Sequence, residues 1–270
     1  MLLSAAIYLW ESEAYDVMRA TFYLTLLVFF VARAGADPVP ATQPAVDPTA
    51  DQILRQSCDF LAQSPVFAVH AEIWKDVILP SGHKIQVTRS VDLDLRRPDR
   101  FHVDARAHKK GRSIWYDGKT LTVLDREKNL YSVVDAPASI DQTLDLAAET
   151  YGITVPLEDL AVSDPYSSSM KNVTAGGYFG DEPVLGVSCR HVGFSTDQID
   201  WQLWVADGPQ PLPQKLVITY KNKDQTPQYI AIFTKWNLTD RAADLAFQFI
   251  PPPGSAPIPL SRQNTGGNQP

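Results

Sequence analysis

The spacing of apolar residues changes from helical to extended near residue 65. The Asp47-Pro48 pair, typical of a helix start, precedes apolar residues at helical spacing, namely Ile53, Leu54, Cys58 and Leu61. From Val66 onward apolar and polar residues alternate, which is typical of antiparallel strands with one buried face. We therefore expect an amphipathic helix followed by a long β-hairpin.

Further alternating runs, separated by Gly, Pro, Asp and Asn turns, predict that the chain continues as a meander. These runs lie at 101–105, 113–116, 121–124, 130–134, 178–179, 184–194, 199–205, 215–220, 229–236 and 245–249. Helical spacing returns at 139–149 and 156–160, and the polar segment 163–169 predicts a loop. The fold class that follows is mainly β (α+β). We expect a large curved antiparallel sheet or unclosed β-barrel of about ten strands, with two or three helices packed on one face.

The first 36 residues predict a secretory signal peptide. Arg19, an apolar run at 22–31 and the small residues Ala34-Gly35-Ala36 follow the order of such a signal. Acidic residues precede Arg19, which is unusual for a leader, so Met18 is a candidate start of translation. The alternative is an N-terminal membrane anchor, although the apolar run is short for a membrane span. Export predicts a periplasmic location in the bacterial cell envelope.

The remaining chain divides by composition into three parts. The proline-rich segment 37–47 predicts an extended linker, 48–250 one folded β domain, and the proline-rich segment 251–270 a tail that crosses the surface or trails off. We expect the mature protein to be a monomer.

Charge and motifs exclude several functions. The formal net charge of −7 disfavours a nucleic-acid partner. The chain contains no H-E-x-x-H, G-x-S-x-G or phosphate-loop motif, so we expect no catalytic residues, metal site or cofactor. Its two cysteines leave two interpretations open. Cys58 is a core residue of the helix, or it forms a disulfide with Cys189, which requires Cα atoms within about 7 Å.

The predicted sheet is rich in aromatic residues. Large residues occur at both parities of the strands, and Trp201 and Trp204 are expected on opposite faces. A sheet with an apolar hollow under the helices would accommodate them. The candidate ligand-binding residues of this hollow are Trp74, Phe101, Val103, Trp115, Tyr116, Trp201, Leu203 and Phe233.

Four segments carry a family resemblance: Arg97-Pro98-Asp99-Arg100-Phe101, Tyr116-Asp117-Gly118-Lys119, I-D-W-Q-L-W at 199–204 and P-L-P-Q-K-L at 211–216. They resemble an uncharacterised bacterial family of predicted periplasmic proteins. More distantly, the helix-first order and the Arg-Pro strand start are similar to the lipoprotein-carrier superfamily of LolA and LolB. That resemblance implies an unclosed β-barrel capped by helices, with acyl chains in the hollow beneath. It also implies an arginine that holds the lid, for which Arg97 and Arg100 are the candidates.

Three hypotheses follow for the function. The first is non-catalytic binding of a lipid, an acylated protein or another hydrophobic ligand. The second is a protein-interaction or sensor module of the envelope whose core is filled by its own side chains, and the third is a hydrolase with an unrecognised site. An apolar cavity larger than about 300 Å³ favours the first, and a solid core favours the second.

Overall fold

The computed structural model describes residues 45–107, 110–239 and 244–263. The predicted signal peptide and most of the predicted linker lie outside these residues. Within them, no helix is long and apolar enough to cross a membrane.

The described part of the chain forms one twelve-stranded sheet. Its strand order is β12-β6-β5-β4-β3-β2-β1-β11-β10-β9-β8-β7. The strands are β1 (Val66–Ile78), β2 (Lys84–Arg96), β3 (Arg100–Ala107), β4 (Lys110–Tyr116), β5 (Thr120–Asp125), β6 (Leu130–Asp135), β7 (Ala175–Val184), β8 (Val187–Ser195), β9 (Ile199–Ala206), β10 (Pro213–Tyr220), β11 (Gln228–Asn237) and β12 (Ala256–Pro257). The predicted mainly β class with an unclosed antiparallel sheet is confirmed.

The sheet consists of two meanders joined at its centre. Strands β1–β6 are consecutive neighbours, as are β7–β11, and the antiparallel pairing of β1 with β11 connects the two sets. In that pairing Ala68 lies opposite Asn237, so residues from the two ends of the domain meet in the middle of the sheet.

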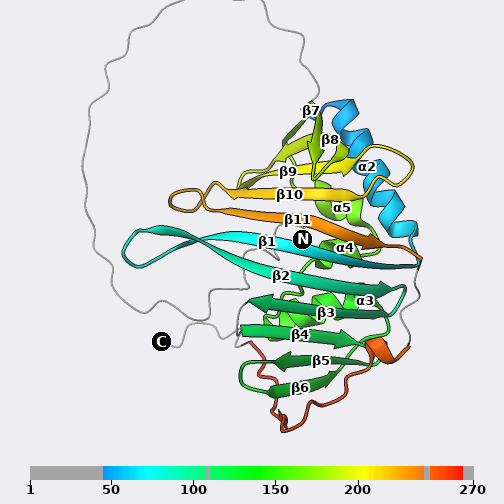
Figure 1. Cartoon of the computed structure of the whole chain (residues 1–270), viewed down its shortest axis with the longest axis vertical. Helices are drawn as coiled ribbons and strands as arrows, with labels where there is room; N and C mark the ends of the chain where they lie inside the picture. The colour runs from blue at the N-terminus through cyan, green and yellow to red at the C-terminus, as the bar shows by residue number, and fades with distance from the viewer. Residues whose placement is uncertain (1–44, 108–109, 240–243, 264–270) are drawn as a thin grey trace, which may run out of the picture.

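The helices lie on one face of the sheet, behind it in the view of Figure 1. They are α2 (Pro48–Gln63), α3 (Ile140–Asp145), which continues into the π-helical turn η2 (Leu146–Thr150), α4 (Glu158–Ala161) and α5 (Pro165–Met170). The side chain of Asp47 caps α2 by accepting from the backbone N–H of Thr49 at 2.7 Å. The predicted helix is therefore confirmed, and its apolar stripe is buried.

Two apolar clusters lie beneath the helices. The larger cluster combines the concave faces of β1–β5 with α3 and the residues around α4, and includes Phe101, Val103 and Tyr116. The smaller cluster combines α2 with β8–β10 and includes Trp201 and Leu203. Trp204 belongs to a third cluster on the opposite face, as its parity relative to Trp201 predicted.

Three predicted elements differ in the structure. The expected loop at 163–169 contains α5, because Asp164 accepts from the Ser167 N–H and Pro165 occupies the first turn. The expected strand at 245–249 is instead the 3₁₀ helix η3 (Asp244–Phe247), which buries Phe247 and exposes Leu245. The runs expected at 178–179 and 184–194 form the hairpin of β7 and β8, whose turn at Leu185 and Gly186, both with positive φ, falls inside the second run.

The described part of the proline-rich tail, up to residue 263, follows the edge of the sheet. Strand β12 pairs in parallel with β6, Ser132 donates to the Ile258 carbonyl, and the Gln263 N–H donates to the Thr150 carbonyl. At the opposite edge, Val46 forms a parallel bridge with Gly176 at the start of β7. Most of β7 is left as the edge strand.

Candidate functional site

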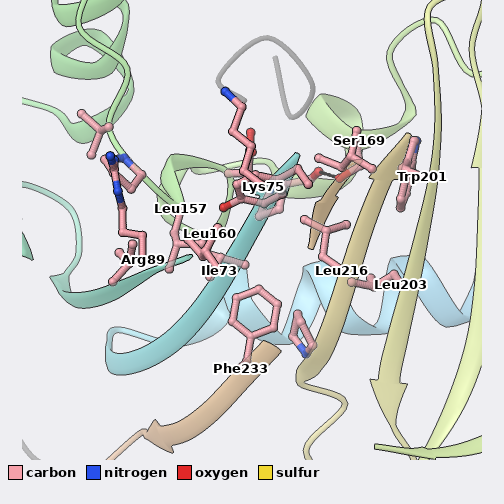
Figure 2. A pocket seen from close by; sticks show the side chains of 18 of the residues that line it. Ile73, Lys75, Arg89, Leu157, Leu160, Ser169, Trp201, Leu203, Leu216 and Phe233 are labelled. Carbon is pink, nitrogen blue, oxygen red and sulfur yellow. Dashed lines mark hydrogen bonds between the residues drawn. The ribbon is translucent and has the colours of Figure 1, made fainter. Parts of the chain in front are cut away.

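A cavity of about 170 Å³ lies between the sheet and the helices α2, α4 and α5. It occupies the place where the two concave clusters meet, because it is lined both by Leu61 and Phe233 of the larger cluster and by Leu54 and Trp201 of the smaller. Figure 2 shows side chains from several strands turned toward this space. Most of the lining is apolar, as expected for a hydrophobic ligand.

The strand contribution comes from both meanders. Ile73 and Lys75 extend from β1, Arg89 from β2, Leu203 from β9 and Leu216 from β10. Alternation along each strand directs these residues to the concave face. A ligand in the cavity would therefore contact both meanders at once.

At the end near the β1–β2 hairpin, the lining becomes polar and partly exposed. Lys75, Val87 and Arg89 are half-buried there, and Thr88 is exposed. Burial lowers the pKa of the Arg89 guanidinium. The opposite end, formed by α2 and β9, is closed over Trp201 and Leu203, which are both buried.

The segment 155–161, which includes α4 and which we call the lid, forms one wall of the cavity. It carries two adjacent acids. Burial raises the pKa of Glu158 to about 7, although its carboxylate accepts from the Val155 N–H. Burial also raises the pKa of Asp159 well above its usual range, and its Oδ1 has no partner among the described residues. The charged forms of both lid acids are thus disfavoured, and Asp159 is the one of the two that lines the cavity.

Arg97, which follows β2, contacts the lid from the sheet side. Its guanidinium donates to the carbonyl oxygens of Ala161 at 2.7 Å, Leu160 at 3.2 Å and Leu61 at 3.5 Å. These bonds connect the lid to the last turn of α2, and the guanidinium is largely buried, which lowers its pKa. Arg100, the other candidate, donates instead to the Asp117 carbonyl in the β4–β5 turn and makes no hydrogen bond with the described lid residues.

Three of the eight predicted lining residues contribute to the cavity: Trp201, Leu203 and Phe233. Phe101, Val103 and Tyr116 lie on the same face but in the filled part of the larger cluster, where the Tyr116 hydroxyl donates to the Pro137 carbonyl. The prediction is wrong for Trp74 and Trp115. Trp74 is one position from the inward-facing Ile73, and Trp115 stacks on His102 and contacts Phe249 on the opposite face of the sheet.

Several lining residues were missed. Ser57 and Cys58 belong to the stripe of α2, and Leu157, Asp159 and Leu160 belong to the lid. The helical spacing of α2 pointed to burial of that stripe, but nothing in the sequence indicated which strands it would cover.

The proposed disulfide is absent, since both cysteines are free. Cys58 lies in the cluster beneath α2, whereas Cys189 packs with Trp204 and Val217 on the other face of the sheet. The sheet itself separates the two thiols. Burial raises the pKa of the Cys58 thiol to about 12, so the thiol stays protonated at neutral pH.

Comparison with known proteins shows the family of the chain. A family model described as "Predicted periplasmic protein (DUF2092)" matches residues 50–261. The chain belongs to this family. The description of the DUF2092 family agrees with the periplasmic location expected from the first residues. No curated protein matches the chain significantly.

Solved structures similar to this DUF2092 protein include lipoprotein LppX of Mycobacterium tuberculosis, at 16% identity over 72% of this chain and 98% of that one, with a TM-score of 0.44. An uncharacterized conserved protein of Thermus thermophilus is similar at 8% identity, over 78% of this chain and 99% of the other, with a TM-score of 0.45. A LolA superfamily protein of Nitrosomonas europaea is similar at 13% identity, over 74% and 97%, with a TM-score of 0.34.

Proposed function

We propose that this protein binds a lipid, an acyl chain or another hydrophobic ligand in the periplasm, without covalent chemistry. The observation that carries the proposal is the apolar cavity between the helices and the concave face of the sheet. A chain that only needed a stable core would gain by filling this space, because empty apolar volume weakens packing.

The size of the cavity limits what the described conformation holds. Its 170 Å³ is below the 300 Å³ that would favour carriage outright, yet the core is not solid. Cavities of about 150 Å³ admit a benzene ring, so this one takes a short stretch of chain. Burying roughly six methylenes would contribute about 5 kcal/mol, which corresponds to sub-millimolar affinity at best. Tighter binding requires the cavity to widen.

The lid is the wall that can move. Helix α4 has only four residues, and the hydrogen bonds of Arg97 to Leu160 and Ala161 attach it to the sheet. Displacing this short segment would join the cavity to the solvent and lengthen it. Arg97 then acts as the residue that holds the lid closed.

One observation supports a non-catalytic role. The Cys58 thiol in the cavity lining is protonated at neutral pH and is a poor nucleophile.

A matched pair of substitutions tests the proposal. Leu216→Phe adds a ring to the cavity wall, whereas Ile230→Phe adds one on the opposite face of a neighbouring strand. We expect Leu216→Phe to weaken binding of the neutral fluorophore N-phenyl-1-naphthylamine about tenfold, because the variant side chain occupies the ligand volume. Ile230→Phe should leave binding unchanged.

Native mass spectrometry of the purified protein supplies the second readout. A co-purifying lipid is expected with the unmodified chain and less of it with Leu216→Phe. Consistent absence of bound lipid, together with equal fluorophore binding by both variants, would contradict the proposal.

An interaction module is the second candidate. Phe179 and Leu185 on the β7–β8 hairpin are 66% and 73% exposed, and β7 is an edge strand that could pair with an extended segment of an envelope protein. If this hairpin binds a partner, Phe179→Ser with Leu185→Ser will abolish capture of one defined periplasmic protein while leaving fluorophore binding intact.

A further inference from the structure

Three residues of the cavity lining have buried polar atoms without a hydrogen-bond partner in the described part of the chain. These atoms are Ser57 Oγ, Trp201 Nε1 and Asp159 Oδ1. Ser57 and Trp201 are only 1% and 4% exposed, so bulk water does not solvate them. Buried polar atoms in proteins are nearly always paired. Their gathering around one cavity indicates that the partner comes from a ligand.

The chemistry of two of these groups defines what that partner must offer. The indole N–H of Trp201 is a donor only, and the Ser57 hydroxyl can donate in the same way. Ser57 lies on α2 and Trp201 on β9, and these two elements contact each other. A carbonyl oxygen has two lone pairs and can accept from both groups. An alkyl chain offers nothing to either.

The acceptor at this end must be uncharged. The cations of the lining are Lys75 on β1 and Arg89 on β2, which lie three and four strand intervals from β9 in the sheet order, about 14 Å and about 19 Å. Figure 2 shows Arg89 and Trp201 at opposite ends of the cavity. A carboxylate beside Trp201 would be buried without a cation, which is strongly unfavourable. A neutral ester carbonyl avoids this cost.

We propose that the α2–β9 end of the cavity is a polar subsite in which Trp201 and Ser57 donate hydrogen bonds to an ester carbonyl of an acyl lipid. This inference rests on the proposed function and adds a ligand class to it. The cavity then selects esterified chains over bare hydrocarbons and over free fatty acids, whose carboxylate belongs near Lys75 and Arg89 instead.

Competition between ligands of similar length tests the subsite. The purified protein is loaded with N-phenyl-1-naphthylamine, and the fluorophore is displaced with methyl decanoate, n-dodecane or sodium decanoate. We expect methyl decanoate to displace it at about tenfold lower concentration than n-dodecane, the gain typical of one or two hydrogen bonds.

Trp201→Phe and Ser57→Ala should each reduce this ester preference, and together abolish it, while n-dodecane still competes. Trp204→Phe is the matched control, because the Trp204 indole donates to Glu182 on the opposite face of the sheet. The Ser57→Ala variant keeps the test decisive if Trp201→Phe fails to fold.

Equal displacement by methyl decanoate and n-dodecane would contradict the proposed polar subsite but not the proposed binding of hydrophobic ligands. An ester preference that survives in the Trp201→Phe, Ser57→Ala double variant would also overturn it. Failure of the fluorophore and of all three ligands to bind would overturn the proposed function as well.

Discussion

Arg97 combines two properties: its side chain is charged and largely buried, and its side-chain hydrogen bonds within the described part of the chain all go to main-chain carbonyls. The acceptors belong to helix ends, where carbonyl oxygens lack an intrahelical partner. The Leu61 carbonyl also accepts from the Ser64 backbone N–H. The arginine therefore donates hydrogen bonds to carbonyl oxygens at the end of α2 and in the lid at the same time. Its energetic contribution depends on the lid staying closed.

We expect Arg97→Met to lower the free energy of unfolding by about 1–3 kcal/mol and to expose the lid, because the freed carbonyls lose a charged donor. Hydrogen exchange measured by mass spectrometry should show faster exchange of 155–162. Arg100→Met is the control, since Arg100 bonds to Asp117 and not to the lid. Unchanged exchange of the lid in Arg97→Met would contradict the proposed role.

Residue parity explains which site residues the sequence could reveal. The alternating runs beneath the helices predict Trp201, Leu203 and Phe233, and all three line the cavity, while their contact with a ligand stays a prediction. Trp74 and Trp115 were assigned wrongly because alternation separates two faces without saying which of them the helices cover. The donors of Arg97 could not be matched to Leu160 and Ala161 from sequence, since no local pattern connects residues so far apart.

At the scale of elements, α4 is short and acidic for a segment that seals an apolar space. The Glu158 carboxyl has a pKa of about 7, well above that of the unfolded chain, so the folded state binds this proton more tightly. The contribution of Glu158 to the free energy of unfolding is therefore greatest below the pKa of the unfolded chain. It declines as the pH rises from there to about 7. The lid should be tightest in mildly acidic conditions.

Glu158→Gln tests this dependence. The variant amide retains an oxygen that can accept from the Val155 N–H but cannot ionise. Between about pH 5 and pH 8 the unmodified protein should lose up to about 3 kcal/mol of unfolding free energy relative to Glu158→Gln, as measured by denaturant titration. The exposed Glu149→Gln should behave like the unmodified chain. Parallel pH profiles for Glu158→Gln and the unmodified protein would refute the assignment.

Elements with strong local signals were predicted, and those defined by context were not. Helix α2 has a cap, a proline and an apolar stripe, and β1 and β2 alternate over most of their length. Helix α5 is rich in serine and gave no periodic signal. The apolar residues at 245–249 predict a strand, but they do not reveal that Arg96 bonds Asp244 and covers the Phe247 ring.

At the scale of the whole molecule, an open sheet has two edges that could recruit other chains. The C-terminal segment covers one of them through β12 and through Leu260, which packs against the larger cluster. We expect removal of residues 255–270 to uncover β6 and to promote dimers or larger species. Size-exclusion chromatography with light scattering measures this outcome. Removal of only 264–270 is the control, and equal behaviour of the two truncations would argue against edge protection.

The pairing of β1 with β11 was beyond prediction, since the sequence shows strands but not which distant strands become neighbours. The cavity forms only when β1 and β11 pair, because one side of it comes from β1 and β2 and the other from β9–β11. During folding, contacts between such remote segments form at high entropic cost. A ligand can therefore bind only after β11 has paired with β1. Bound ligand should slow unfolding of the protein while leaving the rate of folding nearly unchanged.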